Sequence, residues 1–348
     1  MSPGEDDSIW QNLSSSIQRA LNAAWSNGMP PLASAIHGRW WQLESWLRSL
    51  VYVELRSALG SGWVGALPEI AGTRQKVDGD FHYMATPDAQ YRLAYADVSA
   101  LFKITLDRWE QFAGSLLARN VWAGRIEELR AIRNRIGHCR RPHTDDLARL
   151  EQTLRDLETG AFAAVSAFNC QSHAREDWED AVTKGWLRSE HEAAARLIDH
   201  ARRQYDTIFE LRYSRRPWAS VVADGRSIAG ASGYIWHAYW YFRGGRPFDL
   251  GCFWNYIDHC HDQVLLVCAD SPSSISISFA AKEDPATVAD AIGSCFDSAL
   301  MSLGRGPDVG FGEAWRKRFA EMDARVHVLT PWSSLEESMR NHVSIFGA

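Results

Sequence analysis

Arg133, Asn134 and His138 form an Arg-Asn-x-x-x-His motif near the middle of the chain. Histidine titrates near neutral pH and can accept or donate a proton, whereas arginine keeps its charge and can contact two phosphate oxygens at once. RNA carries its own nucleophile, the 2′-hydroxyl, so a protein that cleaves RNA must supply proton transfer and positive charge beside the phosphorus. The residue types of the motif are suited to that chemistry.

The motif is expected on the outer side of an amphipathic helix. Leu129, Ile132 and Ile136 share one face at helical spacing, and this apolar face must turn toward a core. At about 100° per residue, Asn134 and His138 lie roughly 150–190° from the centre of the apolar face, with the motif arginine nearer its edge. The polar side chains should therefore point away from the core of their own helix.

The segment around the motif is rich in arginine. Residues 125–141 contain six arginines and two glutamates, which leaves a local net charge of +4 in a chain whose net charge is −6. An anionic substrate would be attracted to this segment, and we expect it to contact Arg130, Arg135, Arg140 and Arg141. The negative overall charge excludes a protein that coats nucleic acid indiscriminately, because such binding requires many cations.

Four helices are predicted to hold the motif in place. The first follows residue 39, the second spans about residues 89–118, the third spans about residues 122–138, and the fourth follows Pro142 with Thr144 as its N-cap. Apolar residues recur every three or four positions along the fourth: Leu147, Leu150, Leu154, Leu157, Ala161, Val165 and Phe168. Residues 60–87 are rich in Gly, Asp and Pro and predict an irregular connection that could lie over the site. Together these elements predict a helical bundle.

Two residues of the first helix are candidates for a supporting role. Glu44 and Arg48 lie one turn apart and can form an exposed ion pair. We also consider that Glu44 orients Arg133 or Arg48 through a charge-assisted hydrogen bond. The tryptophans of the same segment are expected to supply packing bulk rather than to stack on a base: Trp40, Trp41 and Trp46.

The second half of the chain predicts a different architecture. A charged helical stretch over residues 175–212 precedes segments rich in aromatic and β-branched residues at 233–242, 264–268 and 275–279, which indicate strands. Asp284-Pro285 should open a helix that reaches about Leu303, and residues 325–329 predict a last strand. The expected organisation is an N-terminal helical extension (1–36), an all-α bundle (37–170) and an α+β domain (171–348).

Length and composition fit two folded domains. The chain has 348 residues, of which 46% are hydrophobic and 23% charged, as in ordinary globular proteins. The N-terminus lacks the features of a secretion signal, and no apolar stretch is long enough to span a membrane, so we expect a cytoplasmic protein. Six cysteines without a CxxC pair predict free thiols.

The motif and its surroundings resemble the HEPN family, in particular its Swt1-like members. The resemblance rests on residues 129–138, on the basic turn and leucine-spaced helix that follow them, and on the segment 41–48 upstream. It covers about 130 residues. Known members are mostly metal-independent endoribonucleases of toxin–antitoxin, abortive-infection and antiviral systems, and they usually act as homodimers. The bundle is therefore expected to have a HEPN-like fold.

The resemblance implies an activity and residue roles. It implies RNA cleavage to a 2′,3′-cyclic phosphate and a 5′-hydroxyl without any cofactor, with Arg133 and His138 as the catalytic residues and Asn134 in support. It also implies a homodimer and an antitoxin or defence-system partner. Many toxin members carry a tyrosine two residues after the histidine, where this chain has Arg140, and this departure disfavours the small toxin subgroup.

Several other interpretations remain open from the sequence. The same helix could hold RNA or a nucleotide without cutting it, or the aromatic-rich second half could recruit a partner. The segment Asp258-His259-Cys260-His261-Asp262 contains metal-ligand types, but neighbours in sequence cannot all converge on one ion, so we predict no metal site. Residues 244–247 resemble a turn more than a phosphate loop.

Overall fold

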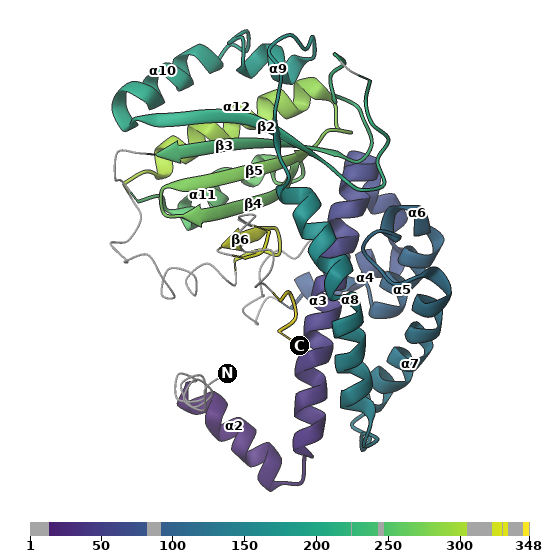
Figure 1. The fold of residues 1–348 in the computed structure, drawn as a ribbon. Coiled ribbons are helices and arrows are strands. Elements are labelled where there is room, and N and C mark those ends of the chain that lie inside the picture. Colours follow the sequence, from purple (N-terminus) through teal and green to yellow (C-terminus); the bar gives the residue numbers. More distant parts are fainter. Residues whose placement is uncertain are drawn as a thin grey trace.

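The fold is described from a computed structural model that covers residues 14–81, 92–223, 225–242, 247–304, 322–328, 330–332 and 344–347. A helical N-terminal part is followed by a six-stranded sheet with helices, so the predicted fold class is confirmed (Figure 1). None of the described helices has the length and apolar character of a membrane span. The predicted turn at 244–247 lies largely outside the described residues.

The bundle is built around α3 (Pro31–Leu59), which runs parallel to α8 (Asp146–Asn169) and is flanked by α5 (Val98–Asp107) and α7 (Arg119–Gly137). The smaller α2 (Ser15–Ser26) precedes α3 and has no buried residue. The leucine-spaced face of α8 is confirmed. Of the residues that define it, all except the partly buried Leu147 are buried, and they face the α3 side of the bundle.

Two sequence predictions in the bundle are wrong. The helix expected over residues 89–118 is broken, in the part that the structure describes, into η2 (Arg92–Tyr95), α5 and α6 (Trp109–Phe112). The Asp97 side chain accepts a hydrogen bond from the Ala100 N–H and so begins a new helix at α5. The connection expected over 60–87 contains η1 (Gly60–Ala66) and α4 (Glu69–Gly79), and its residues 82–87 lie outside the described residues.

The sheet has the strand order β1-β2-β3-β5-β4-β6, with β6 parallel to β4 and the other neighbours antiparallel. Its strands are β1 (Ser172–His173), β2 (Thr207–Arg215), β3 (Tyr234–Phe242), β4 (Val264–Ser271), β5 (Ser274–Ala280) and β6 (Val326–Val328). The strands predicted at 233–242, 264–268, 275–279 and 325–329 are thus confirmed, except that residue 329 lies outside the described residues.

Helices cover both faces of the sheet. One face packs against α9 (Ala181–Trp186), α10 (Ala194–Tyr205), α11 (Leu250–Tyr256) and α12 (Pro285–Ser302), the last being the helix predicted to begin at Asp284-Pro285. Part of the other face packs against the bundle through residues such as Ile235 and Leu266. The charged helical stretch expected over 175–212 is wrong as a single element, because α9 and α10 are separated by residues 187–193. At its end, Asp206 adopts a left-handed conformation (φ 47°) that ends α10, and β2 follows.

The second half of α3 is enclosed by both parts of the protein. Every residue from Leu50 to Ala58 is buried, although an ordinary surface helix buries one face only. Glu54 is fully buried and pairs with the fully buried Arg216, which also donates to the Ala164 carbonyl oxygen at 3.0 Å. Trp218 Nε1 donates to the same carboxylate at 2.6 Å. These contacts join α3, α8 and the chain that follows β2.

A second ion pair links α3 to the sheet domain. Arg56 Nη2 lies 3.3 Å from Glu283 Oε1 and donates to the Gln263 carbonyl oxygen at 3.0 Å. The Ser57 carbonyl oxygen accepts a hydrogen bond of 2.8 Å from the Gly233 N–H at the start of β3. The bundle and the sheet are therefore held at several points along one turn of α3.

The Glu54–Arg216 pair predicts a large stability effect. Glu54→Gln should lower the free energy of unfolding by about 3–5 kcal/mol, because it leaves the Arg216 charge buried without its partner. Urea denaturation followed by tryptophan fluorescence measures the change. Replacing both residues, Glu54→Gln with Arg216→Met, should recover part of the loss.

The matched control is Asp107→Asn, which removes the exposed Lys103–Asp107 pair on α5. Its effect should stay within about 0.5 kcal/mol, because solvent screens exposed pairs. Equal effects of Glu54→Gln and Asp107→Asn would contradict the structural role of the buried pair.

Candidate active site at the end of helix α7

Helix α7 turns its motif outward, as its spacing predicts. Leu129 and Ile132 are buried in the bundle core and Ile136 is partly buried, whereas Arg133, Asn134 and His138 are exposed. The structure thus brings the three motif residues to one exposed helix end. Figure 1 shows that the turn between α7 and α8 lies at the end of the bundle farthest from the sheet.

A regular hydrogen-bonded turn fixes the end of α7 around His138. The Cys139 N–H donates to the Ile136 carbonyl oxygen at 3.0 Å, and the Arg140 N–H donates to the Arg135 carbonyl oxygen at 2.8 Å. Cys139 has φ 52°, a left-handed conformation that usually favours glycine. The two hydrogen bonds satisfy two of the last carbonyl groups of the helix and set the direction in which the chain leaves it.

The Arg133 guanidinium lies alongside the last turn of α7. A Cβ atom built on Gly137 would be 3.7 Å from Arg133 Nη1, so the guanidinium passes over this glycine toward the helix end. The carboxyl end of a helix carries partial negative charge and favours cations there. Binding of an anion at this end therefore depends on the positive charges of the arginine side chains.

The arginines of the basic segment fall into two groups. Arg130 Nη1 donates to Glu127 Oε1 at 2.8 Å, and Arg125 pairs with Glu128 and Asp156. Among the six arginines of residues 125–141, all within the described residues, three are exposed and have no carboxylate partner: Arg133, Arg140 and Arg141. These three are the cations at the motif end that remain available to an anionic ligand.

Arg135 has a structural partner. Its Nε donates to Asp146 Oδ2 at 2.8 Å and its Nη2 donates to Asp146 Oδ1, so the guanidinium holds the buried carboxylate in a fork. Burial alone would raise the pKa of Asp146, but the hydrogen bonds from Arg135 and from the His143 backbone N–H lower it. The predicted N-cap is wrong, because the N-cap position of α8 is Asp145 rather than Thr144, and no side chain makes a capping hydrogen bond there.

Glu44 and Arg48 form the ion pair that their spacing predicts. Arg48 Nη2 donates to Glu44 Oε1 at 2.6 Å, and Trp40 Nε1 donates to the other carboxylate oxygen at 2.9 Å. Both side chains are partly buried rather than fully exposed. Arg48 also donates to the carbonyl oxygens of Leu93 and Ala96, so Glu44 orients Arg48 toward η2 rather than Arg133.

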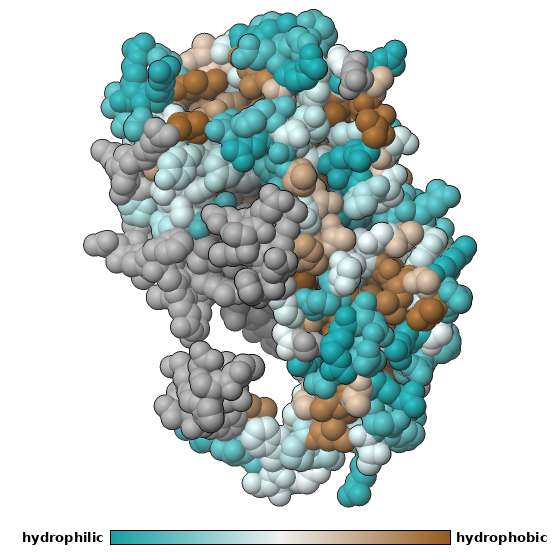
Figure 2. All heavy atoms as spheres, in the orientation of Figure 1, coloured by the Kyte–Doolittle hydropathy of each residue, from teal (hydrophilic) through white to brown (hydrophobic). Residues whose placement is uncertain are grey.

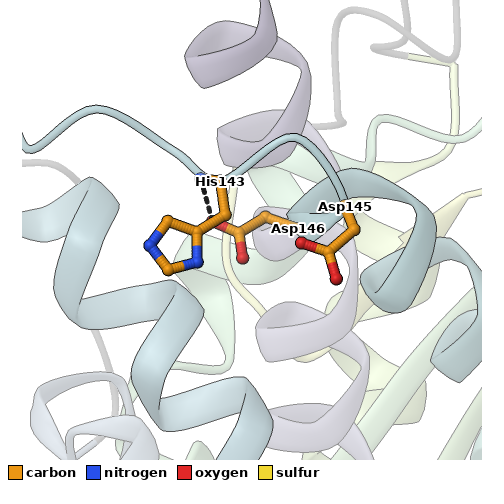
Figure 3. A group of neighbouring side chains, drawn as sticks. All are labelled: His143, Asp145 and Asp146. Atoms are coloured by element: carbon orange, nitrogen blue, oxygen red, sulfur yellow. Dashed lines mark hydrogen bonds between the residues drawn. The ribbon is translucent and has the colours of Figure 1, made fainter.

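The turn after the motif also carries His143, which is not part of the site predicted from the sequence. A ring nitrogen of His143 and oxygens of Asp145 and Asp146 lie within 4.8 Å of one another, and Figure 3 shows the three side chains at the start of α8. Its position five residues after His138 was the one signal in the sequence that could have drawn attention to it.

These ligand-type side chains make a poor metal site. Asp146 is already held by Arg135, and the Asp145 carboxylate accepts a hydrogen bond of 2.7 Å from Arg149 Nε, so a cation would have to displace two guanidinium groups. No other group of three such side chains occurs among the described residues. In the segment Asp258-His259-Cys260-His261-Asp262, His261 bonds to the Trp254 carbonyl oxygen and Cys260 is buried, so the side chains do not converge.

A separate hollow of about 330 Å³ lies between α10 and α12. It is lined by Arg196, Leu197, His200, Tyr205, Asp297, Leu300 and Met301. Apolar residues are visible near this end of the molecule between hydrophilic ones (Figure 2). The hollow belongs to the sheet domain and contains no residue of the motif.

Comparison with known protein families gives a match in the helical part. Residues 41–160 match the Swt1-like HEPN family. The matched segment contains all of α5, α6 and α7, most of α3 and the first part of α8, and therefore includes the motif end. No curated protein and no solved structure matches the chain.

The Arg135–Asp146 pair predicts a pH-dependent contribution to stability. The pKa of Asp146 is lowered in the folded state, so its stabilising contribution is complete above the unfolded value of about 4 and is lost as the pH falls through the folded pKa. Asp146→Asn should lower the melting temperature at pH 7, and the difference from the wild type should shrink in acid. Thermal melts over a pH series measure this.

Asp145→Asn is the control, because that exposed carboxylate pairs with Arg149 on the surface. It should change the melting temperature much less at every pH. An Asp146→Asn protein that melts like the wild type at pH 7 would show that the fork does not hold the turn.

Proposed function

We propose that this HEPN protein is a metal-independent endoribonuclease whose active site is the exposed end of α7. The observation that carries the proposal is the exposure of Arg133, Asn134 and His138 together at one helix end, within the part of the chain that matches the HEPN family. The residue types are those that RNA cleavage through the 2′-hydroxyl requires.

The charges at this end support an RNA substrate. Arg133, Arg140 and Arg141 lack carboxylate partners among the described residues, so a phosphate group would not need to break an ion pair to reach them. In the proposed reaction, Arg133 stabilises the charge that develops on the phosphoryl oxygens, His138 transfers a proton and Asn134 helps to hold the phosphate. Arg140 and Arg141 contact the neighbouring phosphates. Arg130 and Arg135 are engaged in ion pairs with Glu127 and Asp146 and support the site through these pairs.

The biological role follows from the same proposal. An RNA-cleaving HEPN protein suits a toxin or an effector of antiviral defence that acts in the cytoplasm, with an antitoxin or sensor protein as partner. The position of the motif end, away from the sheet domain, leaves that domain available for such a partner (Figure 1).

Single substitutions test the catalytic assignment. Arg133→Ala and His138→Ala should each lower the rate of RNA cleavage by at least about 100-fold, because each removes a group that acts on the transition state. Melting temperatures should stay nearly unchanged, since both side chains are exposed. Cleavage is measured with a fluorescent RNA in a buffer that contains EDTA, where the wild type should remain active.

Arg155→Ala and His259→Ala are the controls, because both side chains are exposed and lie outside the motif end. They should cleave RNA like the wild type. Wild-type rates from both motif variants would overturn the proposal, and so would cleavage that is abolished by EDTA and restored by magnesium. RNA binding without cleavage would indicate a binding module instead.

We also propose that the active form is a homodimer with its two-fold axis close to His138. An isologous interface places each motif end near its own copy and would bring the unpaired arginines of both chains to one RNA strand. Mixing Arg133→Ala and His138→Ala protomers should then give more activity than the two variants measured separately, because one composite site keeps an intact arginine and histidine. Full activity from a protein that is monomeric at the assay concentration would refute the dimer.

A further inference from the structure

Cleavage of RNA through its 2′-hydroxyl involves two proton transfers. A base removes the proton of the 2′-hydroxyl as this oxygen attacks the phosphorus, and an acid gives a proton to the 5′-oxygen as the bond from phosphorus to that oxygen breaks. His138 supplies one imidazole at the end of α7. A second proton-transferring group would have to be another exposed titratable side chain near this helix end.

His143 is exposed on this turn and is held there at its backbone. Its N–H donates to Asp146 Oδ2 at 2.9 Å, and its carbonyl oxygen accepts from the Asp146 N–H at 3.2 Å. One ring nitrogen lies within 4.8 Å of carboxylate oxygens of both Asp145 and Asp146 (Figure 3). The imidazole of His143 thus lies near two carboxylates, on a turn whose backbone is fixed.

One residue connects the positions of the two histidines. The backbone of Arg135 accepts the hydrogen bond that closes the turn after His138, and its side chain holds the carboxylate that binds the His143 backbone. The oxygen that binds the Arg135 Nε at 2.8 Å is the one that binds the His143 N–H. Arg135 and Asp146 thus fix the end of α7 and the start of α8 to each other.

The neighbours of the two imidazoles differ in charge. His138 lies on the turn with Arg133, Arg140 and Arg141, whereas the groups that face His143 are the carboxylates of Asp145 and Asp146, each with its own arginine, Arg149 and Arg135. A carboxylate attracts a cation, whereas a guanidinium attracts an anion. One chain therefore offers two exposed imidazoles, in different surroundings, for the two proton transfers.

We propose that His143 is the general acid of the reaction, a role that rests on the proposed RNA cleavage but not on the dimer. His138 takes the proton of the 2′-hydroxyl, the 2′-oxygen forms a bond to phosphorus, and the bond from phosphorus to the 5′-oxygen breaks. The 5′-oxygen takes its proton from the His143 imidazolium. The products are a 2′,3′-cyclic phosphate and a 5′-hydroxyl, and the two histidines recover their starting protonation by exchange with water.

The experiment compares two substrates that differ in the need for an acid. His143→Gln should lower kcat for RNA by about 100-fold with little change in KM. On uridine 3′-(4-nitrophenyl phosphate), whose nitrophenolate leaves without a proton, the same variant should cleave at a rate close to that of the wild type. His138→Gln should lose activity on both substrates.

His259→Gln is the matched control, because His259 is an exposed histidine beside a carboxylate, 3.7 Å from Asp258, in the sheet domain. It should match the wild type on both substrates. Melting temperatures and the variant His143→Asn separate a loss of folding from a loss of the acid. A wild-type kcat for His143→Gln on RNA, or equal losses on the two substrates, would overturn the proposal.

The outcomes also separate this inference from the proposed function. If Arg133→Ala and His138→Ala abolish RNA cleavage while His143→Gln does not affect it, the protein is a ribonuclease and only the role of His143 is wrong. If the wild type does not cleave RNA, or the motif variants remain active, the proposed function itself fails.

Discussion

Burial of the Glu54 carboxylate imposes a constraint on the whole protein. A charge without contact with water must be matched by another charge and by hydrogen bonds, and Glu54 receives both from Arg216 and Trp218. Because the partners come from the chain after β2, α3 cannot keep its carboxylate satisfied without the sheet domain. The bundle core consequently includes residues of the sheet, such as Ile235 and Leu266, and the bundle and the sheet depend on each other's packing.

This constraint determines which surfaces remain available for function. The second half of α3 and the last turns of α8 pack against the sheet, whereas the opposite end of the bundle carries the turn between α7 and α8 (Figure 1). At that end the buried carboxylate of Asp146 is likewise paired with an arginine, Arg135. One paired carboxylate thus joins the domains, and another fixes the turn that carries His138 and His143.

The sequence predicted those features that depend on local pattern. The outward direction of Arg133, Asn134 and His138 follows from the spacing of Leu129 and Ile132, and the HEPN family was apparent from residues around the motif. The strands of the sheet were recognisable where apolar and β-branched residues cluster. β2 was missed because its alternating charged residues, such as Glu210 and Arg212, resemble a solvated helix face, and only pairing with β3 makes it a strand.

Features that depend on distant partners could not be predicted in this way. The residues near Arg135 in the sequence do not indicate that it pairs with a carboxylate eleven residues later. Arg135 was therefore grouped with the arginines expected to bind substrate. His143 was left out of the predicted site for the same reason. The break before α5 depends on a single side chain, Asp97, that competes with the helical backbone for a hydrogen bond.

The most direct test of the account is the chemistry of the cut itself. An RNA oligonucleotide cleaved at one position is compared with the same oligonucleotide carrying a 2′-deoxy nucleotide on the 5′ side of that position, and the product ends are identified by mass spectrometry. The account predicts a 2′,3′-cyclic phosphate and a 5′-hydroxyl from the first, and no cleavage at that position in the second, because the nucleophile is missing. Cleavage at the 2′-deoxy position, or a 5′-phosphate on the product, would contradict it.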